Sequence, residues 1–247
     1  MERVSVVVPV YNEEGVIAIL VRDLEETLPT LARDYEAVIV DDASTDGTPR
    51  ILDDLAGTRP WLCVHHSEQN GGHGASVMRG LDLATGDWIL QIDSDGQFVV
   101  SEFERLWQRR DECDVALGVR AERSDPRHRL LLTRAVQLAA SLLAGRRIRD
   151  VNTPFRLVRA SVWQDCRAFM APDTLAPNVL VTLGAVVRGW QVVEVPVTHL
   201  ARERSTSTLR HLRLIRFSVR GLGQLVAFRR RLAGEPGGTP IPAGKHA

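Results

Sequence analysis

Three short apolar segments in the first half of the chain end directly at polar or acidic residues, and this recurrence limits the folds open to the chain. Val4–Val10 and residues 35–40 and 88–92 are rich in β-branched and other apolar residues, a pattern typical of strands that are buried on both faces. Segments with helical character separate them. Because strands that alternate with helices form mainly parallel sheets, we expect an α/β fold with helices on both faces of one central sheet.

The rest of the chain continues this alternation, more loosely after residue 118. We expect further strands at 62–65, 115–118, 154–158 and 192–197. We expect helices at 12–28, with Asn12 as the N-cap, and at 48–55, 74–84, 101–110, 130–144, 179–187 and 209–232. The tail at 233–247 is rich in Gly and Pro, which predicts disorder.

Acidic residues follow two of these strands, at the end where parallel sheets bind their ligands. Asp41 and Asp42 follow the second strand, and Asp93 and Asp95 follow the fourth. Mg²⁺ is usually held by one or two carboxylates while substrate phosphates complete its shell, so these acids indicate a metal-dependent nucleotide site. For an isolated D-x-D sequence, a solvated turn after a strand is the alternative interpretation.

The two halves of the chain carry opposite charge, although the formal net charge is zero. Residues 1–118 hold 9 Arg or Lys and 23 Asp or Glu, whereas residues 119–247 hold 22 and 8, so the halves carry about −14 and +14. The basic half suits an anionic partner such as a nucleotide diphosphate, a lipid phosphate or a membrane surface. We do not expect nucleic acid as a partner, because no recognisable nucleic-acid module accompanies the arginines.

Cysteine usage and the apolar runs bear on the cellular location. Cys63, Cys113 and Cys166 are odd in number and widely spaced, so we expect reduced thiols rather than disulfides or a zinc site. A strand-like run begins close to Met1, and no run reaches the roughly 18 apolar residues of a membrane span, so we expect neither a signal peptide nor a transmembrane helix. These features predict a cytoplasmic protein.

Four motifs, in order along the chain, carry a resemblance to a known family. They are VVVPVYNEE at 6–14, VDDASTDGT at 40–48, NGGHGASVMRG at 70–80 and DSDGQ at 93–97. Together they resemble the inverting family-2 glycosyltransferases, and among these the dolichol- and polyprenyl-phosphate sugar synthases. The resemblance covers roughly residues 4–210 and implies a single nucleotide-diphospho-sugar transferase domain of the GT-A type.

The resemblance implies a donor site and a metal site built from these motifs. It assigns the nucleoside to Pro9, Tyr11 and Glu13, the base to Asp42, and the diphosphate to Asp93, Ser94 and Asp95. Asp41 either contacts the nucleotide or supports its own loop, and a helix-capping turn is the alternative for both acids at 41–42. The implied ligands of Mg²⁺ or Mn²⁺ are Asp93, Asp95 and Gln97, with Asp95 and Gln97 as the direct ligands.

A later loop, RERSTS at 202–207, resembles the segment that covers the diphosphate in this family. Arg202 and Ser207 are retained and are expected to bind the donor, whereas Ser205 stands at the family's glycine position and Thr208 at its lysine position. We hypothesise that Arg204 replaces the missing positive charge.

The glycine run at 70–74 is neither a Walker A loop nor a dinucleotide-binding fingerprint, because it lacks Gly-Lys-Ser/Thr and G-x-G-x-x-G. We expect it to let the backbone pass close to the substrate before a helix, with His73 as a loop residue rather than a base. His65 and His66 have no acid at ligand spacing in the sequence, so we expect no metal role for them.

Arginines after residue 118 bear on which of two classes of acceptor the protein uses. A hydroxyl acceptor needs a base, whereas a phosphate monoester, with a second pKa of about 6, is already largely anionic at neutral pH. Arg120, Arg129 and Arg134 resemble acceptor-phosphate arginines of the family, and guanidinium groups suit bidentate phosphate contacts. The alternative is a solvated basic helix face.

Pro154 replaces a glycine of the family, so we expect a different shape for the acceptor-side loop.

The helix expected at 209–232 is amphipathic and basic. Its apolar residues recur at spacings of three and four beside an arginine stripe; they are Leu212, Ile215, Val219, Leu222 and Val226. Two interpretations remain open, a helix packed on the domain and a helix lying in a membrane interface near a polyprenyl acceptor.

We therefore expect an inverting, metal-dependent transfer of a sugar from a GDP- or UDP-linked donor to a polyprenyl or dolichyl phosphate, by a cytoplasmic protein or one bound peripherally to the inner face of the membrane. The expected catalytic residues are Asp93, Asp95, Arg120 and Arg134. Residues 1–208 form the expected catalytic domain, with the donor and metal half at 1–118 and the acceptor half at 119–208.

Two alternatives stay open. The first is transfer to a soluble hydroxyl or amine acceptor, for which Asp150, Asp173 or Glu194 would be the base. The second is a nucleotide-binding module without catalytic activity.

Overall fold

One mixed sheet forms the centre of the molecule. The computed structural model describes residues 2–120, 127–200 and 211–234, except for the side chains of 127–135 and 211–218. The sheet has seven strands in the order β3-β2-β1-β4-β6-β5-β7. The strands are β1 (Val4–Val10), β2 (Tyr35–Asp41), β3 (Leu62–His66), β4 (Trp88–Gln91), β5 (Val115–Arg120), β6 (Arg156–Arg159) and β7 (Val192–Val197). Only β6, among these strands, runs antiparallel to its neighbours, so the expected mainly parallel sheet is confirmed.

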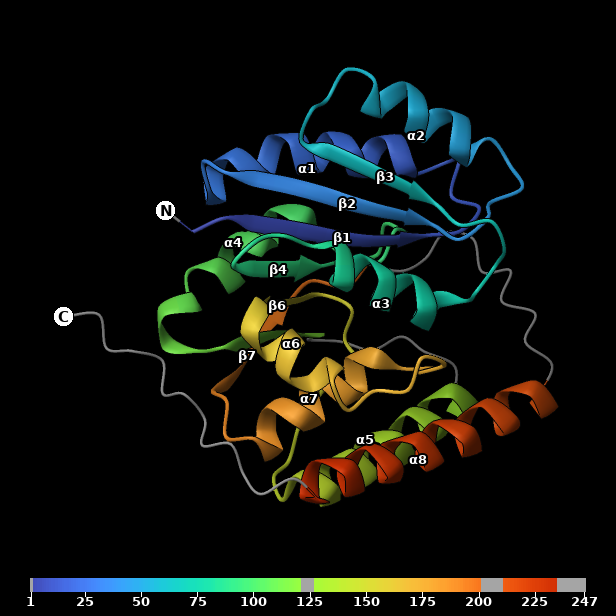
Figure 1. Ribbon diagram of the computed structural model, residues 1–247, viewed down its shortest axis with the longest axis vertical. Coiled ribbons are helices and arrows are strands. Elements are labelled where there is room, and N and C mark those ends of the chain that lie inside the picture. The colour runs from blue at the N-terminus through green and yellow to red at the C-terminus, as the bar shows by residue number, and fades with distance from the viewer. Residues whose placement is uncertain (1, 121–126, 201–210, 235–247) are drawn as a thin grey trace.

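Helices cover both faces of the sheet (Figure 1). They are α1 (Ile17–Leu31), α2 (Thr48–Ala56), α3 (His73–Leu83), α4 (Phe103–Trp107), α5 (Arg127–Ala144), α6 (Ala160–Arg167), α7 (Pro177–Val187) and α8 (His211–Gly234). Side chains from α1, α2 and α4 share one apolar core, and those from α3, α5, α6, α7 and α8 share the other. Helices α5 and α8 lie side by side at the edge of the second layer.

The pleat of β1 explains why its sequence is apolar on every residue but one. Val4, Val6 and Val8 point into the core on the α1 side, and Val7 points into the core on the α3 side. Ser5 is also buried, and its hydroxyl donates a 2.6 Å hydrogen bond to Glu36 of β2. A strand covered on both faces cannot alternate between apolar and polar residues, which is why Ser5 is the one polar residue of this run.

Two expected helices differ in the structure, and one further helix is present. Helix α1 begins at Ile17, and Asn12 is not its N-cap: its φ is 55° and its side chain binds the loop after β2. The helix expected at 101–110 is a short α4 between two 3₁₀ turns, Val100–Glu102 and Arg110–Glu112. Helix α6 was not expected, because its eight residues show too little periodicity to distinguish a helix from a loop.

Helix α8 packs on the domain along one side and leaves apolar residues exposed on another, so it agrees in part with each of the two interpretations, packing on the domain and lying in a membrane interface. Leu225, Phe228 and Leu232 are buried against the domain, whereas Val219 and Val226, from the expected apolar stripe, are exposed. The helix continues to Gly234, so residues 233 and 234 belong to it rather than to the expected tail. Residues 209–210 and 235–247 lie outside the described part of the chain.

Candidate active site

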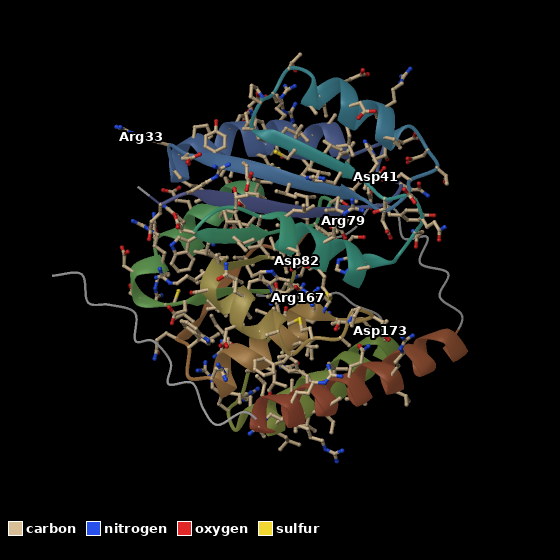
Figure 2. All side chains as sticks on the ribbon, in the orientation of Figure 1. Arg33, Asp41, Arg79, Asp82, Arg167 and Asp173 are labelled. Atoms are coloured by element: carbon tan, nitrogen blue, oxygen red, sulfur yellow. The ribbon has the colours of Figure 1, made fainter. Side chains whose placement is uncertain are left out.

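The fold brings the carboxyl ends of β1, β2 and β4 to one edge of the sheet. The three strands are parallel neighbours, and Val10 at the end of β1 pairs with Asp41 at the end of β2. In Figure 2, Asp41 lies at the edge where the strands end, and Arg33 lies at the opposite edge. Strand β5 runs in the same direction as β4, because β6 is antiparallel to both, so Arg120 ends at the same edge.

The loops after β1 and β2 are bound to each other. The backbone N–H of Asn12 donates a 2.9 Å hydrogen bond to the Ser44 hydroxyl, and Asn12 Oδ1 accepts one of 2.8 Å from the Thr45 N–H. Glu14 Oε2 accepts a 2.7 Å hydrogen bond from the Gly47 N–H. These contacts hold the segment expected to bind the nucleoside in a defined conformation.

Within that segment the expected nucleoside residues have different environments. Pro9 is buried in β1, where it pairs with Val40, whereas the Tyr11 side chain is 47% exposed. The Glu13 N–H donates a 2.9 Å hydrogen bond to the Thr48 hydroxyl. Tyr11 is therefore the one of the three with a large surface open to a ligand.

Asp42 holds the glycine run in place. Its two carboxylate oxygens accept hydrogen bonds of 2.8 Å each from the N–H groups of Gly71 and Gly72, and Asn70 Nδ2 donates one of 3.1 Å to the Asp42 carbonyl. A cavity of about 380 Å³ borders Asp42, Gly71 and Arg79. The carboxylate expected to bind the base therefore also shapes the loop beside this cavity.

Asp41 is buried and supports its own loop. Its Oδ1 accepts a 3.1 Å hydrogen bond from the Ser44 N–H, and its Oδ2 lies 2.7 Å from Nδ1 of His66. The other ring nitrogen of His66 lies 3.1 Å from Asp53 of α2. The hydrogen bond to Asp41 raises the pKa of His66, burial lowers it, and the hydrogen bond to Asp53 and the charges of both acids raise it further, so that the pKa lies above its ordinary value.

The absence of a metal role for the histidine pair stays a prediction, but His66 does have acid partners that are distant in the sequence. Asp41 and Asp53 are 25 and 13 residues away in the sequence, and only the pairing of β2 with β3 and the packing of α2 bring them to the ring. Nothing in the spacing of these residues could have indicated the contact.

His73 is the first residue of α3, not a loop residue as expected, and it contacts the D-x-D motif. Its Nε2 lies 2.9 Å from Oδ1 of Asp93. Burial lowers the pKa of His73, but the charge and hydrogen bond of Asp93 and the charges of Asp95 and Asp42 outweigh this, so the pKa is raised. The glycines before it were the only signal in the sequence for this approach.

The segment that follows Asp93 and Asp95 pairs with residues 199–200, after β7. The Gln97 N–H donates a 3.2 Å hydrogen bond to Asp95 Oδ1, and its side-chain Nε2 donates one of 3.1 Å to the Leu200 carbonyl. Phe98 and His199 form an antiparallel bridge. Arg202, Arg204 and Ser207 follow directly in the sequence but lie outside the described residues.

The donor set at this edge fits a hard divalent cation. Two carboxylates, Asp93 and Asp95, and the amide of Gln97 offer oxygen ligands, which Mg²⁺ and Mn²⁺ prefer. Across residues 2–120, 127–200 and 211–234, no three His, Cys, Asp or Glu side chains are grouped so that they could hold a metal by themselves. Such an incomplete set suits an ion whose shell is completed by substrate phosphates.

Arg120, which is expected to bind the acceptor phosphate, is oriented by an acid. Its Nε and Nη2 donate hydrogen bonds of 2.7 and 3.1 Å to the two oxygens of Asp150, whose side chain is 2% exposed. This bidentate pair fixes the plane of the guanidinium group. Arg129 and Arg134 belong to α5, but their side chains lie outside the described part.

The three carboxylates named above as alternative bases for a hydroxyl acceptor each form an ion pair with an arginine. Asp150 pairs with Arg120, Glu194 lies 3.5 Å from Arg149, and Asp173 contacts Arg220 of α8. The hydrogen bond from Arg220 lowers the pKa of Asp173 below its ordinary range. Asp173 is therefore a weaker proton acceptor than an unpaired carboxylate.

Comparison with known proteins identifies the family. The sequence model described as "Glycosyl transferase family 2" matches residues 5–166. An undecaprenyl-phosphate 4-deoxy-4-formamido-L-arabinose transferase from Pseudomonas fluorescens (strain Pf0-1) is 31% identical over 215 residues, which cover 86% of this chain and 62% of that protein. Its counterpart from Klebsiella pneumoniae (strain 342) is 30% identical over 217 residues, 87% of this chain and 65% of that protein. The chain thus spans less than two thirds of the length of these relatives.

Solved structures share the fold at low sequence identity. Glucosyl-3-phosphoglycerate synthase from Mycobacterium tuberculosis, in complex with Mn²⁺, UDP and phosphoglyceric acid, has a TM-score of 0.65 at 17% identity, covering 92% of this chain and 78% of that one. A mannosyltransferase from Pyrobaculum calidifontis, in complex with GDP-Man and Mn²⁺, has a TM-score of 0.63 at 20% identity, covering 93% and 64%. These likenesses confirm the expected GT-A type of fold. Because this family model matches residues 5–166, more than half of the chain, the chain belongs to glycosyltransferase family 2.

Proposed function

We propose that this protein transfers a sugar from a nucleotide-diphospho-sugar to a polyprenyl phosphate, in a metal-dependent reaction that inverts the anomeric configuration. The observation that carries the proposal is the meeting of Asp42, Asp93 and Arg120 at one edge of the sheet, which joins acids suited to a donor and metal with an arginine suited to an anionic acceptor. The names of the relatives from Pseudomonas and Klebsiella, which specify undecaprenyl phosphate, support the acceptor class.

The donor is proposed to bind between the loops after β1 and β2 and the glycine run. Tyr11 offers an exposed ring to the nucleoside, and Asp42 lies beside a cavity of about 380 Å³, a volume typical of ligand pockets. We propose that the diphosphate of the donor lies next to Asp93, Ser94 and Asp95. When bound by Asp93, Asp95 and Gln97, Mg²⁺ or Mn²⁺ supplies positive charge that stabilises the departing diphosphate.

The acceptor is proposed to bind at Arg120, with Arg129 and Arg134 adding charge. A phosphate monoester is already largely anionic at neutral pH, so the protein has to position it rather than deprotonate it. Its oxygen attacks the anomeric carbon from the face opposite the diphosphate, which inverts the configuration. The pairing of Asp150, Asp173 and Glu194 with arginines supports this acceptor over a hydroxyl, for which a base would be needed.

Transfer of a labelled sugar to a lipid tests the acceptor class. Thermal-shift screening with GDP- and UDP-linked sugars first selects the donor, and the labelled donor is then incubated with Mn²⁺ and undecaprenyl or dolichyl phosphate. We expect the label to partition into organic solvent. Label on a water-soluble acceptor would instead support the hydroxyl alternative, and donor binding without transfer to any acceptor would support a binding module.

Substitution of Arg120 tests its role in acceptor binding. Arg120→Lys keeps the charge opposite Asp150 but loses the bidentate geometry. We expect the KM for the lipid phosphate to rise about tenfold while the KM for the donor is unchanged, because a charge-assisted hydrogen bond contributes about 1.5–3 kcal/mol. Arg149→Lys, at a side chain that is 72% exposed, is the matched control. Equal effects in the two variants would contradict the assignment.

We also propose that α5 and α8 attach the protein peripherally to an anionic membrane at the inner face. The two helices lie side by side (Figure 1), and they expose Leu138 and Leu142 from α5 and Val219 and Val226 from α8. Arg229, Arg230 and Arg231 in the last turns of α8 add positive charge, which favours anionic lipid headgroups. None of the described helices is both long and apolar enough to span a bilayer.

Vesicle flotation tests this attachment. We expect binding to vesicles that contain phosphatidylglycerol, weaker binding to pure phosphatidylcholine, and loss of binding in the double variant Leu138→Asp, Leu142→Asp. Ile19→Asp is the matched control, since Ile19 is 50% exposed on α1, on the opposite face of the sheet. Flotation of the double variant equal to that of the unsubstituted protein would exclude these leucines from the membrane contact.

A further inference from the structure

The glycine run forms a direct link between the acid after β2 and the acid after β4. The Asp42 carboxylate accepts 2.8 Å hydrogen bonds from the N–H groups of Gly71 and Gly72. The next residue, His73, places Nε2 at 2.9 Å from Asp93 Oδ1. The acid proposed for the base and the first acid of the D-x-D motif are therefore joined through three consecutive residues.

The backbone on both sides of His73 has little freedom. Gly72 has a φ of 83°, which residues with a side chain rarely adopt. Gly74 packs so closely on the 174–175 loop that a Cβ there would lie 2.6 and 2.7 Å from the carbonyl oxygens of Thr174 and Leu175. The backbone of His73 is therefore held on both sides, and its imidazole, with a side chain that is 56% exposed, contacts Asp93 from this fixed start of α3.

The side chains at this link suit an outer partner of a metal-binding carboxylate. The side chain of Asp93 is 29% exposed, so one face remains open to a ligand while Oδ1 contacts the histidine. Carboxylates that ligate metals are commonly oriented by such hydrogen bonds, and loss of the partner typically weakens metal binding about 10- to 100-fold.

We infer that His73 is a positioning residue for Asp93, and that Asp42 acts through the Gly71–Gly72 turn to set the position of His73. The inference rests on the proposed function, since it concerns the geometry of the proposed metal site. It assigns Asp42 a second role in the donor site: besides facing the base, Asp42 keeps the D-x-D motif in its metal-binding arrangement.

Metal affinity provides the test, because it is measured without turnover. Mn²⁺ binding is followed by electron paramagnetic resonance in the absence of nucleotide and in the presence of GDP or UDP. We expect His73→Ala to weaken Mn²⁺ binding about 10-fold or more, and His73→Gln, which retains an N–H donor, to recover part of the loss. His65→Gln is the matched control and should bind Mn²⁺ normally, because His65 lies within β3, where it pairs with Val40 of β2.

A second variant tests the relay from Asp42. Asp42→Asn removes the acceptor from one glycine N–H at least. With pyrophosphate in place of a nucleotide, so that no base is present for Asp42 to contact, we expect it to weaken Mn²⁺ binding although Asp42 is not a proposed metal ligand. Unchanged folding of each variant is checked by circular dichroism and thermal unfolding. Should His73→Ala fold less well, the comparison of His73→Gln with His65→Gln decides the question.

The outcomes separate this inference from the proposed function. Mn²⁺ binding by His73→Ala and His73→Gln equal to that of the unsubstituted protein overturns the positioning role while leaving the proposed transferase intact. Normal binding by Asp42→Asn overturns the relay. If the unsubstituted protein binds no Mn²⁺ even with GDP or UDP, the proposed metal-dependent function fails, and the inference fails with it.

Discussion

At the residue scale, Arg156 is a buried cation that binds backbone carbonyls. The side chain is 1% exposed; its Nε donates a 2.8 Å hydrogen bond to the Thr153 carbonyl, and its Nη1 donates one of 2.9 Å to the Asn178 carbonyl. Burial lowers the pKa of Arg156 to about 9, against the opposing charges of Asp150 and Asp93, so the group stays charged at neutral pH. Arg156 thus links the segment between α5 and β6, through Thr153, to α7, through Asn178.

We predict that Arg156→Met lowers the free energy of unfolding by about 3 kcal/mol or more, because several buried carbonyls lose their donor. Urea unfolding measures the change. Arg149→Met is the control: its ion pair with Glu194 is largely exposed on the arginine side, so we expect a change of about 1 kcal/mol or less. A loss below that of the control would show that the carbonyls find other donors.

A second prediction at this scale concerns His66 and pH. Its hydrogen bonds to Asp41 and Asp53 raise its pKa in the folded protein above the ordinary value of about 6.5. The charged ring therefore stabilises the fold fully below about pH 6.5, and this contribution is lost as the pH rises through the folded-state pKa. We predict that His66→Gln destabilises the protein more at pH 5.5 than at pH 8.5, as measured by urea unfolding. A pH-independent difference would contradict the charged pair.

At the scale of elements, α3 lies against the sheet because Gly80 allows a close approach. A Cβ at Gly80 would collide with Cγ1 of Val7 in β1 and would lie 3.4 Å from Cγ2 of Val40 in β2. The same helix is joined to α6 by the Asp82–Arg167 ion pair, which Figure 2 shows between the two halves of the chain. The packing of α3 on the sheet thus also sets the position of its first residue, His73.

We predict opposite effects of alanine at two helical glycines. Gly80→Ala should destabilise the protein by about 1–3 kcal/mol through overpacking. Gly221→Ala in α8, where a Cβ meets nothing within 4 Å, should stabilise it by up to about 1 kcal/mol through helix propensity. Thermal unfolding measures the change in stability of each variant. Stabilisation by Gly80→Ala would mean that α3 can move away from β1.

At the scale of the whole molecule, the strands of the two halves interleave. Strand β6, from the second half, lies between β4 and β5, and β5 itself crosses residue 118. A chain that ends at 118 would expose the edge of β4 and leave the α3 side of the sheet without α6 and α7. We predict that residues 1–118 alone show no cooperative urea unfolding. A cooperative transition in that fragment would instead make the donor half an independent folding unit.

The sequence by itself determined the strands and the family. Uniformly apolar, β-branched runs such as Val4–Val10 are recognisable because burial on both faces removes polar residues from a strand. The acids at 41–42 and 93–95 were predictable as a shared site because parallel strands end at one edge. The four motifs carried the family, and the matching family model confirms it.

Only the tertiary structure decided which side chains contact one another at that edge. His66 reaches Asp41 and Asp53 across three elements, His73 reaches Asp93 from the start of α3, and Arg120 is held by Asp150 from a loop 30 residues away. Asn12 binds the loop after β2 instead of capping α1. Such contacts depend on strand register and helix packing, which bring distant residues within 3 Å of each other and leave no periodic trace in the sequence.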